Sequence, residues 1–237
     1  MTVTAAACLT LGLVWALMRE LCTAPQTAQT QKNQAAKLNW QFFRRGRLFY
    51  FMGVACLTGM IRDGLTSWAP VYFSEEFSLN ATLSLILSAV LPAAKILALA
   101  VHPAVQKKIP KIRMQLIVFY VGCAAAACIV LLANLAGWTL AAAGFMAVML
   151  CLMVCTDLSF TISIPIQFGS VGRSATVSGI LDCMLYLGAA ISSYLFALLA
   201  QWGGWTATIV SWIVIPLIAI GILLSRKNLE PETAEKD

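Results

Sequence analysis

Five charged side chains stand inside apolar runs of this chain, and they are the groups best placed to do chemistry. Two of them are adjacent in the segment GMIRDGLTSWAPVYF, which runs from Gly59 to Phe73. A charge at the centre of a bilayer costs about 2.5–3.5 kcal/mol on insertion scales, so such residues face the interior of a helix bundle and usually have a partner. The five are Arg62, Asp63, Lys95, Asp157 and Asp182.

The composition shows that the runs around these charges are membrane spans. Of the 237 residues, 60% are hydrophobic and 11% are charged, whereas soluble domains have about 25% charged residues. At about 20 apolar residues per crossing, the chain has room for about seven spans. We therefore predict an all-α, polytopic membrane protein with spans at 2–18, 48–72, 81–102, 114–133, 138–165, 174–200 and 205–224.

The basic residues predict the orientation of these spans. Fourteen of the 16 Lys and Arg fall in loops on one side, at 19–47, 103–113, 166–173 and after 224. The opposite loops contain none, which follows the positive-inside rule. We expect a multi-pass protein of the cell inner (plasma) membrane with its N-terminus outside and its C-terminus cytoplasmic. The net charge of +6 therefore reports topology and contact with lipid, not a nucleic-acid partner.

The distribution of charge among the spans suggests repeats of three helices. The first, fourth and seventh spans contain no charged residue, while the others do. We expect 1–18 to be the last helix of an N-terminal half and 19–47 to be a cytoplasmic linker. Residues 48–224 would form a six-helix half of two three-helix repeats, each with its third helix toward lipid, and 225–237 a cytoplasmic tail. We also expect Gly188, Ala189 and Ser192 at a close helix contact, because small residues let helix backbones approach.

The positions of the charges predict which groups can meet. Lys95, Asp157 and Asp182 each lie about 10 Å from the inner end of a span, at 1.5 Å per residue, so Lys95 with Asp182 or Asp157 would make a breakable cytoplasmic latch. Arg62 lies near mid-depth. Because Arg62 and Asp63 are about 100° apart on a helix, we expect one to point into a cavity and the other toward a neighbouring helix.

Other classes of site are not supported by the sequence. Seven of the eight cysteines lie within apolar runs, where a thiol behaves as a small hydrophobic group. His102, the single histidine, is expected to be interfacial, and no His, Cys, Asp or Glu cluster has the spacing of a metal site. We expect no cofactor, no metal and no enzyme activity. A seven-span receptor would explain the span count but not the sorting of charges in threes.

Two segments resemble a known transporter family. MIRDGLTSWAPVYFSE with LILSAVLPAAKI, and GRSATVSGILDCMLYLGAAISSYLFALLAQWGGW, are similar to the seventh, eighth and eleventh helices of the major facilitator superfamily. Within it, the organophosphate:phosphate antiporters and their uncharacterised bacterial relatives are the most similar branch. The resemblance covers about residues 40–237, and the first span is similar to a sixth helix.

The resemblance implies secondary active transport of a small polar solute, expected to be anionic (phosphorylated or carboxylated), by alternating access. Arg62 matches an arginine that binds substrate phosphate in that branch, where its fork meets two oxygens. We expect Arg62, Lys95, Trp68 and Tyr186 to contact solute and Asp63, Asp157 and Asp182 to form gating or ion pairs.

The sequence allows more than one coupling ion and more than one way to complete the transporter. Inorganic phosphate could be the counter-ion, or a proton carried by Asp157 or Asp182 could drive a transporter of another solute class. The Asp-Arg-x-Gly loop motif of the superfamily is absent from HPAVQKKIPKIR. A complementary N-terminal half, in the same or a missing chain, would be needed to enclose a central site, and the remaining alternative is a non-functional fragment.

Overall fold

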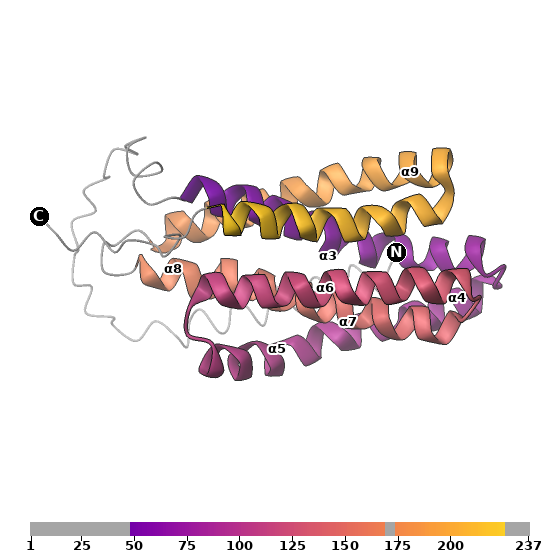
Figure 1. Cartoon of the computed structure of the whole chain (residues 1–237), viewed down its shortest axis with the longest axis horizontal. Helices are drawn as coiled ribbons and strands as arrows, with labels where there is room; N and C mark the ends of the chain where they lie inside the picture. Colours follow the sequence, from indigo (N-terminus) through magenta and orange to yellow (C-terminus); the bar gives the residue numbers. More distant parts are fainter. Residues whose placement is uncertain (1–47, 169–173, 226–237) are drawn as a thin grey trace, which may run out of the picture. The chain divides into compact units, whose positions relative to one another are not determined.

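The computed structural model describes residues 48–168 and 174–225. The predicted span 1–18, the linker 19–47 and nearly all of the predicted tail lie outside this part of the chain. Its regular elements are helices, and five helical stretches are long and apolar enough to cross a membrane. The last, α9 (Ser174–Leu224), reverses at Gly204, so the five stretches make six crossings (Figure 1). The predicted all-α polytopic class is confirmed.

Short connections join the crossings. The first crossing is α3 (Leu48–Glu76), the second is α4 (Ala81–Ser88) with α5 (Val90–Lys108), and the third is α6 (Ile112–Leu135). The fourth is a composite of α7 (Thr139–Leu158), a π-helical turn η1 (Ser159–Ser163) and α8 (Ile164–Gln167). Helix ends differ from the predicted ones by a few residues, most at the C-terminal end of α5.

Local sequence signals explain where the chain turns. Asn80 caps α4, because its side-chain oxygen accepts a hydrogen bond from the Leu83 N–H at 2.9 Å, which satisfies a donor that the first turn leaves free. Gly204 has φ 67°, a left-handed conformation that glycine adopts without steric cost. This glycine therefore allows the sharp reversal between the two arms of α9, which lies between the predicted spans 174–200 and 205–224.

The closest packing is between α3 and α9. A side chain on Gly188 would overlap the backbone carbonyl of Cys56, and one on Gly59 would overlap that of Leu185. Ser192, one turn beyond Gly188, is 1% exposed. The predicted close contact at Gly188 is confirmed, and it brings the backbones of α3 and α9 together on both sides of the crossing point.

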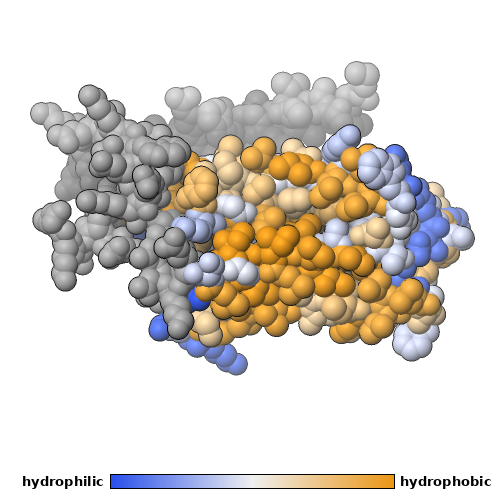
Figure 2. Space-filling view, turned by 45° about the horizontal axis from the view of Figure 1, so that its top comes forward, coloured by the Kyte–Doolittle hydropathy of each residue, from blue (hydrophilic) through white to orange (hydrophobic). Residues whose placement is uncertain are grey.

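The outward surface is apolar over the middle of the crossings. On the face drawn in Figure 2, hydrophobic side chains cover the centre and hydrophilic ones gather toward the ends. In α6 the exposed residues Met114, Val118, Val121, Ala125, Ile129 and Leu132 recur every three or four positions, as on one helix face. The composite of α4 and α5 is the least buried crossing, with 22% of its apolar window buried against 56% in α3.

At one end of the bundle, side chains connect α3 to two other crossings. The Tyr72 hydroxyl donates to Asn134 Oδ1 at 2.8 Å, and Asn134 Nδ2 donates to Glu76 Oε1 at 2.9 Å. Trp205 Nε1 donates to Glu75 Oε2 at 2.9 Å. Glu75 and Glu76 lie in the loop region predicted to be outside, so these bonds fix α3, α6 and the second arm of α9 to one another there.

Candidate functional site

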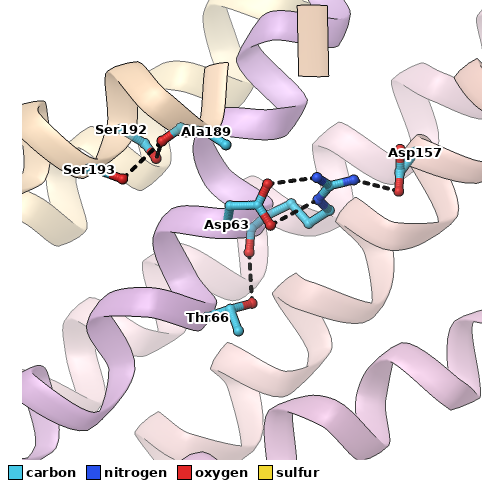
Figure 3. A network of polar contacts seen from close by, with 7 residues as sticks. Asp63, Thr66, Asp157, Ala189, Ser192 and Ser193 are labelled. Atoms are coloured by element: carbon cyan, nitrogen blue, oxygen red, sulfur yellow. Dashed lines mark hydrogen bonds and ion pairs between the residues drawn. The ribbon is translucent and has the colours of Figure 1, made fainter. Parts of the chain in front are cut away.

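The guanidinium of Arg62 lies between two carboxylates. Its Nη2 is 2.6 Å from Asp63 Oδ2 and its Nε is 3.3 Å from Asp63 Oδ1, a bidentate contact. On the other side its Nη1 is 2.7 Å from Asp157 Oδ2. Figure 3 shows the carboxylates of Asp63 and Asp157 on opposite sides of the guanidinium, on separate helices. We call Asp63, Arg62 and Asp157 the charge triad.

The backbone around Arg62 is held by small residues and a hydroxyl. Gly64 lies against the ring of Phe196, where a side chain would not fit, so α9 covers that side of α3. Thr66 Oγ1 donates to the carbonyl of Arg62 at 3.0 Å. Arg62 is 9% exposed, and its long side chain reaches α7, where Asp157 lies one residue before the helix ends.

The expectation that Arg62 and Asp63 would face different targets is wrong in this state. Their Cα–Cβ bonds diverge by about 100°, but the flexible arginine stem brings the guanidinium back onto the carboxylate of its neighbour. A planar fork with five donors can bind two carboxylates at once. The helical angle between two positions therefore does not limit a side chain of this length.

Tyr186 is a further predicted site residue that lies at the charge triad. Its ring lies under the Arg62 guanidinium, with 5.7 Å from the Cζ atom to the ring centroid, a cation–π distance. The side chain comes from the first arm of α9 and is 61% exposed. Tyr186 therefore marks the side on which the charge triad is accessible.

The predicted latch between Lys95 and a carboxylate is wrong in this state. Asp157 pairs with Arg62 instead, and among residues 48–168 and 174–225 neither Lys95 nor Asp182 forms an ion pair. Lys95 is half-buried on α5, which packs against α7 through Ala94 and Ala98. Similar depth did not bring Lys95 to Asp157 because α5 turns smaller residues toward α7.

Asp182 lies near the charge triad without binding it. It is half-buried on α9, one turn before Tyr186, whose ring contacts the Arg62 guanidinium. Two carboxylates, those of Asp63 and Asp157, contact the guanidinium, and Asp182 is a third acidic group on a neighbouring crossing. The local charge is negative while all of them are ionised.

Trp68 is not beside Arg62. It packs against Trp205 with ring centroids 6.4 Å apart, in an aromatic cluster that also contains Tyr72 and Trp212. Six residues separate Trp68 from Arg62, or about 9 Å along α3. In this conformation the aromatic cluster binds helices together, and a solute contact of Trp68 stays a prediction.

One oxygen of the charge triad has no partner. Asp157 Oδ1 is buried and accepts no hydrogen bond from any described residue, although Oδ2 binds Arg62. An unpaired buried polar atom costs about 1–3 kcal/mol, and more for a charged group. This oxygen is therefore available to a proton or to another hydrogen-bond donor.

A second buried polar group was missed by sequence reasoning. His102 is 6% exposed, not interfacial as expected, and its Nε2 is 3.1 Å from Ser159 Oγ. Gln115 of α6 is fully buried beside Ser159. The recurrence of Ser88, Lys95 and His102 at seven-residue intervals was the available signal, since that spacing places all three near one face of the crossing that α4 and α5 make.

A metal site needs several ligating side chains in one place, and the structure describes residues 48–168 and 174–225. No group of three or more His, Cys, Asp or Glu side chains among these residues is placed to hold a metal ion. The side chains that meet at the charge triad can bind an anion, exchange ion-pair partners or carry a proton.

Comparison with known proteins identifies the family. The family model described as Major Facilitator Superfamily matches residues 1–193, which is most of the chain and includes the charge triad. No curated protein and no solved structure matches. Members of this superfamily are membrane transporters of small molecules, which agrees with the six apolar crossings. The chain therefore belongs to the major facilitator superfamily.

Proposed function

We propose that this protein carries a small anionic solute, phosphorylated or carboxylated, by secondary active transport with alternating access, and that Arg62 binds the solute. The observation that supports this most is a buried guanidinium near mid-depth whose three nitrogens each bind a carboxylate oxygen. A phosphate or carboxylate of a solute presents the same pair of oxygens to the fork. The solute would therefore replace Asp157 or Asp63.

The two carboxylates have a clear role while the site is empty. An uncompensated arginine would be costly inside a membrane, and Asp63 and Asp157 neutralise it. An arriving anion competes with them for the same donors. Solute binding would then break the contact between α3 and α7, which gives the solute a means to change the conformation.

The other predicted site residues have roles around the charge triad. Tyr186 would line the entrance, because it stacks on Arg62 and is exposed. Lys95, which has no ion pair in the described ranges, would offer a second positive charge to the solute, with Trp68 contacting it in another conformation. Asp63, Asp157 and Asp182 would act in gating. A complementary half of the transporter would cover the charge triad on the Tyr186 side.

Proton coupling is a second candidate, favoured by the unpartnered oxygen of Asp157. Protonation of Asp157 would weaken its bond to Nη1 of Arg62 and free a donor for the solute. In this scheme the proton and the anion enter together, whereas in the antiport scheme inorganic phosphate takes the place of the solute.

Flux measurements separate the two schemes. We expect proteoliposomes of the full-length protein, loaded with inorganic phosphate, to take up a labelled phosphorylated or carboxylated solute faster than empty ones. Uptake driven by a pH gradient alone, without internal phosphate, would support the proton scheme. Transport only of neutral or cationic solutes would contradict an anion site at Arg62.

A further inference from the structure

A line of polar contacts joins α5 to the fourth crossing. Each contact joins residues 57 positions apart, and the successive contacts are four residues apart on both helices. From one end to the other they are Cys155 Sγ to the Ala98 carbonyl at 3.6 Å, His102 Nε2 with Ser159 Oγ at 3.1 Å, and Gln106 Nε2 to Ser163 Oγ at 3.3 Å. We call these six residues the α5 seam.

The π-helical turn η1 keeps the α5 seam in register. Residues four apart on an α-helix drift by about 40° around its axis, so a long polar line would wind away from its partner. The wider turn of η1 rotates less per residue and reverses that drift between Ser159 and Ser163. Such π-turns occur frequently at functional sites, and here the turn begins two residues after Asp157.

A group beside the α5 seam, on α6, is not satisfied in this conformation. Gln115 is 0% exposed, and its Oε1 accepts a long hydrogen bond of 3.5 Å from Ser159. Its Nε2 has no partner within residues 48–168 and 174–225. A fully buried amide with one end unpaired requires an explanation. A second arrangement of the same helices, in which the amide gains a partner or meets water, provides one.

The turn η1 also connects to the charge triad. Thr161, inside η1, donates from Oγ1 to the carbonyl of Asp157 at 2.8 Å. Its own carbonyl lacks an α-helical donor because Pro165 has no N–H, and Ser178 Oγ of α9 donates to it at 3.3 Å. The turn is therefore held by α5 on one side and by α9 on the other.

The geometry of the helix makes the α5 seam and the charge triad interdependent. Asp157 lies about 200° around the helix from Cys155 and Ser159, so α7 presents its seam residues to α5 and its carboxylate to Arg62. If η1 rewound to a regular α-helix, residues beyond it would rotate by about 100° relative to those before it. The contacts at Ser163 and at Asp157 could not then both be kept.

We infer that the α5 seam is a latch coupled through η1 to the ion pair between Arg62 and Asp157. A closed seam holds Asp157 on Arg62, and an open seam releases the guanidinium. His102, Gln115 and Ser159 are thus positioning residues for the charge triad. The role of the latch in transport rests on the proposed function, but the coupling itself is measurable without a solute. Because coupling is reciprocal, breaking the ion pair must loosen the seam.

Cys155 is a native reporter of the α5 seam, since it is fully buried there. In the full chain, with Cys155 kept as the sole cysteine and the protein in lipid vesicles, we would measure its labelling rate with N-ethylmaleimide. Arg62→Ala removes a side chain on α3 whose polar contacts among the described residues go to Asp63 and Asp157 and not to the α5 seam. We expect labelling about tenfold faster, within the range of allosteric couplings. Tyr72→Phe, on the same helix at the far end, is the control and should label at the rate of the parent.

A second variant keeps the inference testable if Arg62→Ala does not fold. Gln115→Leu removes the unpaired amide and favours the closed seam, so we expect slower Cys155 labelling together with slower solute turnover. A residue with only a structural role would not slow turnover. Cys155 labelling at the parent rate in Arg62→Ala, or unchanged turnover in Gln115→Leu, would overturn the latch. Lost uptake in Arg62→Ala with unchanged labelling would leave the proposed function standing without the latch.

Discussion

Arg62→Lys is expected to lower kcat/KM for the solute by about a hundredfold or more, although the positive charge is kept. A hundredfold loss corresponds to about 2.7 kcal/mol of transition-state stabilisation. Arginine uses Nε, Nη1 and Nη2 to bind two carboxylates, and lysine offers one compact charge in place of this fork. Lysine therefore cannot meet two oxygens of the solute in the same plane. Uptake into proteoliposomes at equal protein content measures the loss.

The matched control is Arg113→Lys, the same substitution at the start of α6. Arg113 Nε donates to the carbonyl of Leu223 near the end of α9, far along the chain from the charge triad. We expect this variant to transport at close to the parent rate. If Arg62→Lys transported as well as Arg113→Lys does, Arg62 would have a structural role only.

Gly188→Ala is expected to reduce the amount of folded protein severely, although it adds one carbon atom. That carbon would overlap the backbone carbonyl of Cys56, which cannot move without separating α3 from α9. Overpacking of a tight contact costs about 1–3 kcal/mol and occasionally more. Because backbone atoms are involved on both helices, we expect Gly188→Ala to lower the free energy of unfolding by about 3 kcal/mol. The yield of monodisperse protein after detergent extraction reports the effect.

Gly221→Ala is the control for the same chemical change in the same helix. Gly221 is exposed and has open space where its side chain would be. Alanine at position 221 should leave the yield of folded protein unchanged or raise it slightly, since alanine is a better helix former than glycine. Equal yields of the two variants would show that α3 and α9 are not packed as closely as described.

The sequence predicts the crossings well because hydropathy depends on local composition. Each apolar run must span the bilayer, so Leu48–Glu76 and Ile112–Leu135 appear within a few residues of the predicted ends. Gly188 could also be predicted, because small residues in a membrane helix mark close backbone approach. Both predictions need only the residues of one helix.

The partners of the charges could not be predicted in the same way. Membrane helices are apolar on the faces toward lipid and toward one another, so the sequence does not indicate which side of α5 packs on α7. The predicted pair of Lys95 with Asp182 or Asp157 is therefore not formed in this state. The rotamer that brings the Arg62 guanidinium onto Asp63 also cannot be predicted from the spacing of the two residues. The turn η1 depends on the contacts of Ser159 and Ser163 with α5, which only the assembled bundle provides.

Direct binding tests most sharply whether Arg62 is an anion site guarded by Asp157. The measurement is equilibrium binding of the labelled anionic solute found by uptake to solubilised parent protein, Arg62→Ala and Asp157→Asn. Asp157 competes with the solute for Nη1 of Arg62, so we expect Asp157→Asn to bind about tenfold more tightly while transporting slowly. Arg62→Ala should bind no solute. Parent affinity in Arg62→Ala, or unchanged or weaker binding in Asp157→Asn, would contradict a guarded anion site.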